Sequence, residues 1–229
     1  MSAKEISHQE LAEKLLYLQN ELGCHNINFV SPSHFVPQIL KTLLLAIPMG
    51  LKIPLVYNTS GYDSLATIKM LEGVIDIYLP DLRYTSSKTA KKLSQASNYV
   101  ENDRACIKEM YRQVGNLITD ENGIAQRGLI IRHLILPVKL AGSEESLTWL
   151  AKELPADVNI SVMAQYYPAH KAKLFPELAR GITEPEYLEV IDLLNELGLE
   201  NGWIQEMSAP ENYQPDFEQK GHPFEKNAS

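Results

Sequence analysis

The chain has 229 residues, a length that allows one large domain or one domain with a tail. Its 45% hydrophobic and 22% charged residues are typical of a globular protein and exclude disorder as the main state. Lys and Arg number 21 against 29 Asp and Glu, a formal net charge of −8, which argues against non-specific binding to nucleic acid or to anionic membranes.

The longest apolar stretches, 43–47 and 134–138, are far shorter than the roughly 18 residues that a membrane-spanning helix needs. The first residues carry no charged-then-apolar export signal. We therefore expect a cytoplasmic protein that binds neither a membrane nor nucleic acid. The two cysteines, Cys24 and Cys106, match no metal or redox spacing.

Helix and strand patterns alternate from the beginning of the chain. Ser7 and Glu10 form a capping box ahead of an amphipathic helix that ends at Gly23. The patterns that follow predict strands at 26–30, 54–57 and 74–79, helices through 43–46 and around 65–71, and one or two helices within 86–114.

The second half begins with a hairpin inserted near 117–131. Its turn is predicted at 120–123, because Asn-Gly tolerates the positive φ that such turns require. A second capping box, Thr183 with Glu186, starts the last helix. The remaining patterns predict strands at 129–136, 159–164 and 203–207, helices at 143–153 and up to 197, and a long loop at 166–181.

The six candidate strands lack polar alternation and are separated by helices, which indicates a parallel sheet buried on both faces. Right-handed crossovers then give an α/β fold, a partial β/α barrel of parallel strands, with a doubly wound sheet as the main competitor. We expect this barrel to occupy residues 1–209, and we expect the polar residues 210–229 to form a flexible tail.

Polar, small and tyrosine side chains gather where the predicted strands end. In either architecture ligands bind at these carboxyl ends, so the pattern favours a functional mouth. The alternative is that loops are polar and turns hold Asn, Ser and Gly in any protein. The segments concerned are 31–34, 58–62, 81–84, 137–139 and 165–170.

Arg132 lies inside an apolar strand, where an unpaired cation is costly, so it must reach a partner or a wet lumen. A structural ion pair is the simpler explanation. His133 faces the other way, which favours a hydrogen-bonded interior histidine. Asp81 is either a ligand or a turn residue, and His34 and His170 are either mouth groups or exposed loop histidines.

Several long runs resemble the radical S-adenosylmethionine family, most closely the uncharacterised relatives of pyruvate formate-lyase activating enzyme. The resemblance extends in order over nearly the whole chain, to about Glu206. It is carried by residues 25–37, 56–62, 75–83, 131–137, 165–171 and 200–205.

The resemblance implies a partial β/α barrel in which a 4Fe-4S cluster reductively cleaves S-adenosylmethionine. The 5′-deoxyadenosyl radical then abstracts a hydrogen, in activating enzymes from a glycine of a glycyl-radical-type partner. In this sequence Ser-Pro-Ser replaces the family's Gly-Gly-Glu-Pro segment, and Asp-Leu-Arg resembles its Asp-Leu-Lys. The residues that the resemblance assigns to cofactor binding are Ser31, Pro32, Ser33, Asn58, Thr59, Ser60, Asp81, Arg83, Arg132 and His170.

The family's Cys-x3-Cys-x2-Cys cluster loop is not found in this sequence. Three thiolates are needed to bind the cluster while one iron stays open for the cofactor. Cys24 precedes its strand and Cys106 falls in mid-helix, so neither substitutes, and no metal ligand is expected in this chain. We expect a chain that begins after the cluster loop, lacks the first strand and is inactive alone. Its expected partner is a cluster-bearing N-terminal fragment.

The missing strand would leave the edge at 26–30 unpaired, which predicts self-association through that edge. Two other functions stay open. One is a cluster-free module that binds S-adenosylmethionine or a protein. The other is a barrel hydrolase or lyase that uses His34, His170 and Asp81 as acid–base groups, which requires two of them within hydrogen-bond reach.

Overall fold

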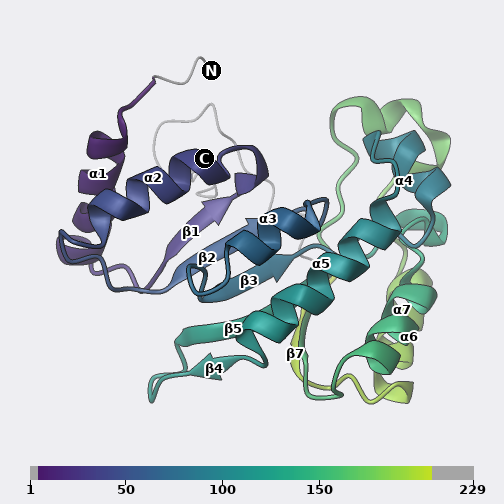
Figure 1. Cartoon of the computed structure of the whole chain (residues 1–229). Coiled ribbons are helices and arrows are strands. Elements are labelled where there is room, and N and C mark those ends of the chain that lie inside the picture. The colour runs from purple at the N-terminus through teal and green to yellow at the C-terminus, as the bar shows by residue number, and fades with distance from the viewer. Residues whose placement is uncertain (1–4, 208–229) are drawn as a thin grey trace, which may run out of the picture. The chain divides into compact units, whose positions relative to one another are not determined.

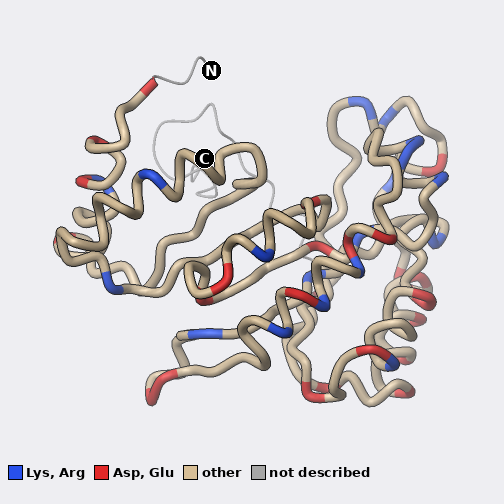
Figure 2. Tube along the Cα trace, in the orientation of Figure 1, with Lys and Arg blue, Asp and Glu red and all other residues tan. Residues whose placement is uncertain are grey.

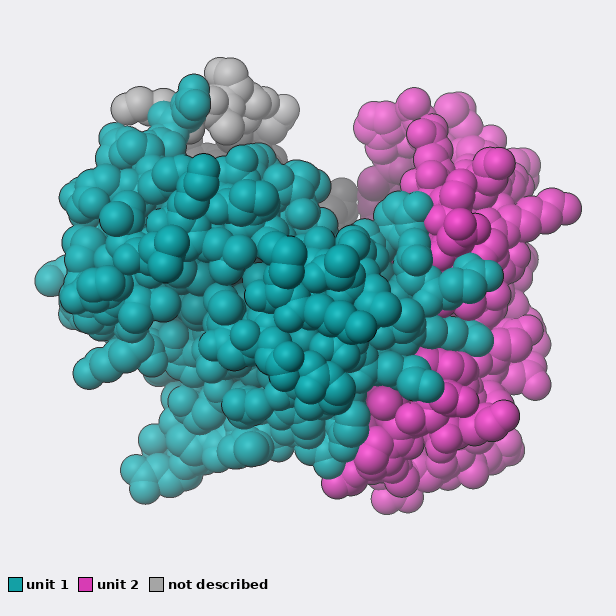
Figure 3. Space-filling view, viewed as in Figure 1, with its two compact units in different colours: residues 1–80, 101–130 teal, residues 81–100, 131–229 magenta. Residues whose placement is uncertain are grey.

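The computed structural model describes residues 5–207 (Figure 1). The tail expected at 210–229 lies outside the described residues. The chain divides into two compact units (Figure 3). Unit 1 comprises the residues up to Pro80 together with Glu101–Ile130, and unit 2 comprises Asp81–Val100 together with the residues from Ile131 onward.

A mostly parallel sheet organises the chain, with the strand order β1-β2-β3-β5-β6-β7. Pairing is parallel between β1 and β2, β2 and β3, β3 and β5, and β6 and β7. This confirms the predicted α/β class and is consistent with a partial β/α barrel. The strands are β1 (Ile27–Val30), β2 (Leu55–Thr59), β3 (Ile77–Pro80), β4 (Ile118–Thr119), β5 (Ala125–Leu134), β6 (Asn159–Met163) and β7 (Gly202–Ile204).

The described residues of unit 1 form four α-helices. The capping box of the first helix forms as predicted: the Glu10 backbone N–H donates to Ser7 Oγ at 3.1 Å, and the Ser7 N–H donates to Glu10 Oε2 at 2.7 Å. This first helix packs against the second (Figure 1). The helices are α1 (His8–Asn20), α2 (Val36–Ala46), α3 (Leu65–Met70) and α5 (Tyr99–Val114). Of α5, the residues from Glu101 onward belong to unit 1, and the first two belong to unit 2.

The predicted hairpin is present in unit 1, where β4 pairs antiparallel with β5. Its turn closes through Asp120, whose N–H donates to the Ile124 carbonyl at 2.9 Å, and Gly123 supplies the positive φ of +76°. Further along β5, Gly128 has φ +131°, and a Cβ there would lie 2.5 Å from the Asn116 carbonyl oxygen. Only glycine fits this close approach of two backbones.

Unit 2 packs its helices around a core of small and aromatic residues. The Tyr84 and Tyr99 rings meet edge to face, with centroids 5.5 Å apart, a favourable geometry for aromatic pairs. The second capping box, Thr183 with Glu186, forms as predicted. The elements are α4 (Ser87–Ser94), α6 (Ser143–Glu153), α7 (Glu184–Glu196) and the 3-10 turns η2 (Pro137–Lys139), η3 (His170–Leu174) and η4 (Pro176–Leu178).

Several predicted strand boundaries are wrong by two to four residues, among them the end of β7, which lies at Ile204 rather than at residue 207. β2 continues through Thr59, so part of the predicted loop is strand. β3 begins at Ile77 rather than at residue 74, because Val74 closes the turn after α3 by donating its N–H to the Leu71 carbonyl. β5 begins at Ala125, where pairing with β4 extends it. Within residues 5–207, no helix is long and apolar enough to cross a membrane.

Candidate functional site

In unit 1 the ends of β1 and β2 lie side by side. The Ser31 N–H donates to the Asn58 carbonyl at 2.8 Å, which joins two of the predicted segments. Ser31 adopts φ +52°, a left-handed conformation that turns the chain into η1 (Pro32–His34). Pro32 is buried there, while Ser31 and Ser60 are exposed. His34 is also exposed, and its ring lies 5.3 Å from that of Phe35.

Asp63, four residues after the end of β2, is a buried carboxylate that the sequence analysis does not predict. Its oxygens accept hydrogen bonds from the Tyr57 hydroxyl at 2.8 Å and from the Thr59 hydroxyl. Burial raises the pKa of Tyr57, and the Asp63 charge raises it further, while a hydrogen bond from Ser33 opposes the rise. Tyr57 therefore stays a hydroxyl donor that fixes the carboxylate. Of the predicted residues, Thr59 joins this network through its hydroxyl, and Ser33 interacts with Tyr57.

In unit 2, Asp81 holds two guanidinium groups, from Arg83 and Arg132. Arg132 Nη2 lies 2.5 Å from Asp81 Oδ1, and Arg83 bonds the other carboxylate oxygen. The Asp81 side chain is 9% exposed, but those of Arg83 and Arg132 are 34% and 27% exposed. The structure thus brings the predicted residues Asp81, Arg83 and Arg132 together in one ion-paired group. The group carries one excess positive charge, and its two arginine side chains are partly exposed.

The backbone sets the geometry of this group. Asp81 and Arg132 form a parallel bridge, and the Leu82 N–H donates to the Arg132 carbonyl at 2.8 Å. The Tyr99 hydroxyl donates to the Asp81 carbonyl at 2.8 Å and accepts from the Arg83 N–H at 3.2 Å. Tyr99 therefore positions the segment between its two charged residues. No local sequence pattern identifies Tyr99, because its partners lie 16–18 residues away.

His170 does not join this group. It is the first residue of η3, is exposed and has φ +48°. Within the described part of unit 2, the Asp81 carboxylate accepts a hydrogen bond from Arg83 and forms an ion pair with Arg132, and neither contact involves His170. The described part of unit 2 therefore does not support the hypothesis of a hydrolase that uses Asp81 and His170 as an acid–base pair.

His133 is the interior histidine that its place in β5 predicts. Its side chain is fully buried, with Nδ1 at 2.7 Å from the Leu82 carbonyl oxygen and Nε2 at 2.8 Å from Ser143 Oγ. Burial lowers the pKa of His133, although the Leu82 carbonyl and the Asp81 charge both act to raise it. The imidazole is therefore neutral at pH 7. Arg132 and His133, adjacent in the strand, bind an ion-pair partner and a helix terminus respectively.

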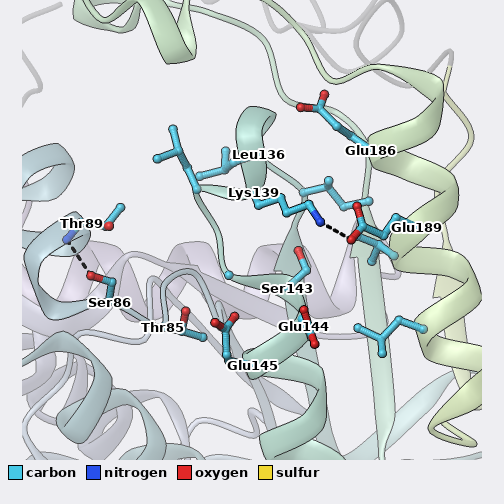
Figure 4. A pocket seen from close by; sticks show the side chains of 15 residues that line it. Thr85, Ser86, Thr89, Leu136, Lys139, Ser143, Glu144, Glu145, Glu186 and Glu189 are labelled. Carbon is cyan, nitrogen blue, oxygen red and sulfur yellow. Dashed lines mark hydrogen bonds and ion pairs between the residues drawn. The ribbon is translucent and has the colours of Figure 1, made fainter.

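A cavity of about 290 Å³ lies in unit 2 beside the start of α6 (Figure 4). Lys139 crosses it to pair with Glu189, and Glu186 accepts from the Val138 N–H at 2.7 Å. Val138 and Lys139 both have positive φ, at +48° and +56°, an unfavourable conformation for side chains of this kind. Polar and apolar residues share the lining: Thr85, Ser86, Thr89, Ile135, Leu136, Lys139, Leu140, Gly142, Ser143, Glu144, Glu145, Glu186, Glu189, Val190 and Leu193.

The cysteines do not fit an iron–sulfur cluster. Cys106 is fully buried and its thiol donates to the Asp63 carbonyl at 3.4 Å. Burial raises the pKa of Cys106 to about 12, so the thiolate that a cluster needs is disfavoured. Cys24 is partly exposed. Among residues 5–207, no three His, Cys, Asp or Glu side chains group closely enough to hold a metal ion.

No family model matches the chain. It is 32% identical over 178 residues to the uncharacterized protein MJ0674 of Methanocaldococcus jannaschii. The match spans 76% of this chain and 47% of that protein, so the chain spans about half the length of the curated relative it matches.

Two solved structures of HydG are among those with a similar fold. A crystal structure of HydG, a maturase of the [FeFe]-hydrogenase, matches 89% of this chain and 45% of its own with a TM-score of 0.54 and 12% identity. HydG from Carboxydothermus hydrogenoformans matches 98% of this chain and 55% of its own, with a TM-score of 0.50 and 17% identity.

A domain of pyruvate-formate lyase-activating enzyme from Bacteroides vulgatus matches 79% of this chain and 98% of its own, with a TM-score of 0.49 and 14% identity. At identities this low, the likeness to the two HydG maturases concerns the path of the backbone alone. The chain therefore has an α/β fold similar to that of the two HydG maturases.

Proposed function

We propose that the chain is the S-adenosylmethionine-binding part of a radical S-adenosylmethionine enzyme. The observation that carries this proposal is the group of Asp81, Arg83 and Arg132 within a fold of this type. S-Adenosylmethionine carries a carboxylate, and two half-exposed guanidinium groups around one carboxylate leave a positive charge for it. Arg132 Nε is buried and has no hydrogen-bond partner in the described structure, so this guanidinium keeps one unsatisfied donor.

The remaining assigned residues support the same cofactor. By the resemblance, Ser31, Pro32 and Ser33 replace the segment that would hold the methionine amino group, and Ser31 is exposed at a left-handed turn. Asn58 and Thr59 end β2, and Ser60 follows them. We propose that these residues contact the cofactor and that His170 contributes a polar contact from η3.

Calorimetry with S-adenosylmethionine tests the proposal. Arg132→Met keeps the length of the side chain but removes its charge, and we expect binding to weaken about 10–100-fold, as for the loss of a charge-assisted hydrogen bond. Arg112→Met is the matched control, because Arg112 is an exposed arginine paired with Glu72 and Glu109. Equal weakening in both variants, or no binding by the unmodified chain, would contradict the proposal.

Radical chemistry needs three thiolates that the described residues do not supply. We propose that a separate cluster-bearing segment provides them and that the substrate is a glycyl-radical-type protein, as for activating enzymes. Iron and sulfide added to the chain alone should give no stoichiometric 4Fe-4S absorbance, and Cys106→Ser should change nothing. A full cluster spectrum would contradict this. A glycyl-radical EPR signal on the partner, dependent on that segment, is the expected result for the complete system.

A cluster-free module that binds S-adenosylmethionine is the second candidate, because the buried thiol of Cys106 does not suit a cluster. Affinity measured in air without iron separates the two. Tight binding under those conditions favours the module, whereas binding that appears only with the cluster-bearing segment favours the enzyme.

A further inference from the structure

Ser143 and His133 form a hydrogen-bonded pair beside the cavity of unit 2. His133 Nε2 lies 2.8 Å from Ser143 Oγ, and Ser143 is among the residues that line the cavity. His133 is fully buried and Ser143 is half-buried, so a ligand in the cavity can contact the Ser143 hydroxyl but not the imidazole. Neither residue belongs to the group around Asp81.

The second hydrogen bond of His133 determines which atom carries its proton. Nδ1 lies 2.7 Å from the Leu82 carbonyl oxygen, which only accepts, so Nδ1 must be protonated. The neutral imidazole then has an unprotonated Nε2, which must accept the hydrogen bond from the Ser143 hydroxyl. A hydroxyl that donates to a base oriented by a third group is the arrangement found in serine nucleophiles.

The start of α6 adds donors next to this hydroxyl. Ser143 is the first residue of the helix, and the N–H groups of the first turn have no acceptor within the helix. The preceding Gly142 has φ +65°, and a Cβ there would lie 1.8 Å from the Thr85 hydroxyl oxygen. Glycine thus allows the turn that presents Ser143 at the helix terminus, where negative charge that develops on a substrate oxygen is stabilised.

The lining of the cavity indicates the class of substrate. Leu136, Leu140 and Val190 offer an apolar surface for an acyl chain. Lys139 is the one cation in the lining and is paired with Glu189, while α7 and the start of α6 bring glutamates (Figure 2, Figure 4). These carboxylates disfavour an anionic ligand. The cavity therefore suits a short acyl ester that is neutral or cationic.

We propose that Ser143 and His133 are the nucleophile and general base of an acyl-transfer site that cleaves short, uncharged or cationic esters. Ser143 Oγ bonds to the acyl carbon while its proton passes to His133 Nε2. The bond from that carbon to the leaving oxygen breaks, and the leaving oxygen takes the proton from Nε2. Water then gives a proton to Nε2 and its oxygen to the acyl carbon, which releases the acid and returns the proton to Ser143 Oγ.

The test uses a fluorophosphonate and 4-nitrophenyl acetate on the full chain. In the fluorophosphonate reaction a bond forms between Ser143 Oγ and phosphorus, and the phosphorus–fluorine bond breaks to release fluoride. The proton of the Ser143 hydroxyl is released to solvent. We expect one adduct per chain, which peptide mass spectrometry places on Ser143. We expect Ser143→Ala to lower the esterase rate at least about 100-fold, the usual contribution of such groups.

Ser87→Ala is the matched control, because Ser87 is the first residue of α4 as Ser143 is of α6. It should keep both the adduct and the esterase rate. An unlabelled chain, an adduct on another residue or an unchanged rate in Ser143→Ala overturns the proposal. The position of the adduct is measured on the unmodified chain, so this result does not depend on whether Ser143→Ala folds. It also does not depend on S-adenosylmethionine binding.

Discussion

Single residues of unit 2 show how one strand supplies two kinds of interior polar group. In β5, Arg132 and His133 are adjacent, so their side chains point to opposite faces of the sheet. Arg132 reaches Asp81, and His133 reaches the Leu82 carbonyl and Ser143. The sequence predicts both outcomes, because an apolar strand tolerates a cation only with a partner and a histidine only with hydrogen bonds. It does not predict Tyr99, Asp63 or Ser143, whose partnerships join distant segments.

The buried His133 makes stability depend on pH. Its pKa is lowered in the folded chain, whereas in the unfolded chain it is about 6.5. Below that pH the unfolded state binds a proton that the folded state does not, so stability falls as pH falls. We expect a loss of about 1–2 kcal/mol between pH 7 and pH 5. Urea unfolding at both values measures it. In His133→Asn the pH dependence should shrink, and an unchanged slope would contradict the assignment.

At the scale of elements, local signals predict helix starts well and strand ends less well. The capping boxes at Ser7 and Thr183 lie within three residues of their partners, so the sequence alone reveals them. Near the start of β5, Gln126 is half-buried and Arg127 is exposed, and only the pairing with β4 makes this segment a strand. The two 3-10 turns in the predicted loop at 166–181 likewise follow no apolar period.

Gly128 within β5 gives a prediction at this scale. Gly128→Ala would place a Cβ 2.5 Å from the Asn116 carbonyl oxygen at φ +131°. We expect a loss of about 1–3 kcal/mol of unfolding free energy, measured by denaturant titration, from strain and overlap together. Gly73→Ala is the control, because Gly73 also has positive φ but has no atom within 4 Å of an added Cβ. Equal losses in the two variants would show that the overlap contributes nothing.

At the scale of the whole molecule, the sheet ends on β1, whose described backbone pairing is to β2 alone. Val30 at the end of that strand is 67% exposed. An open strand edge with apolar residues favours pairing with another chain. We predict concentration-dependent self-association in analytical ultracentrifugation, reduced by Val30→Lys. Met70→Lys, which adds the same charge at an exposed site on α3, should not reduce it. A chain that is monomeric at every concentration would contradict this prediction.

The arrangement of the two sulfur atoms has a practical consequence. Cys106 is shielded by the surrounding fold, whereas Cys24 is partly open to solvent. A maleimide dye added under native conditions therefore attaches at a single defined place. The inner sulfhydryl becomes available to the dye only when the chain opens, so the number of dyes attached per molecule reports directly on the opening of the first unit.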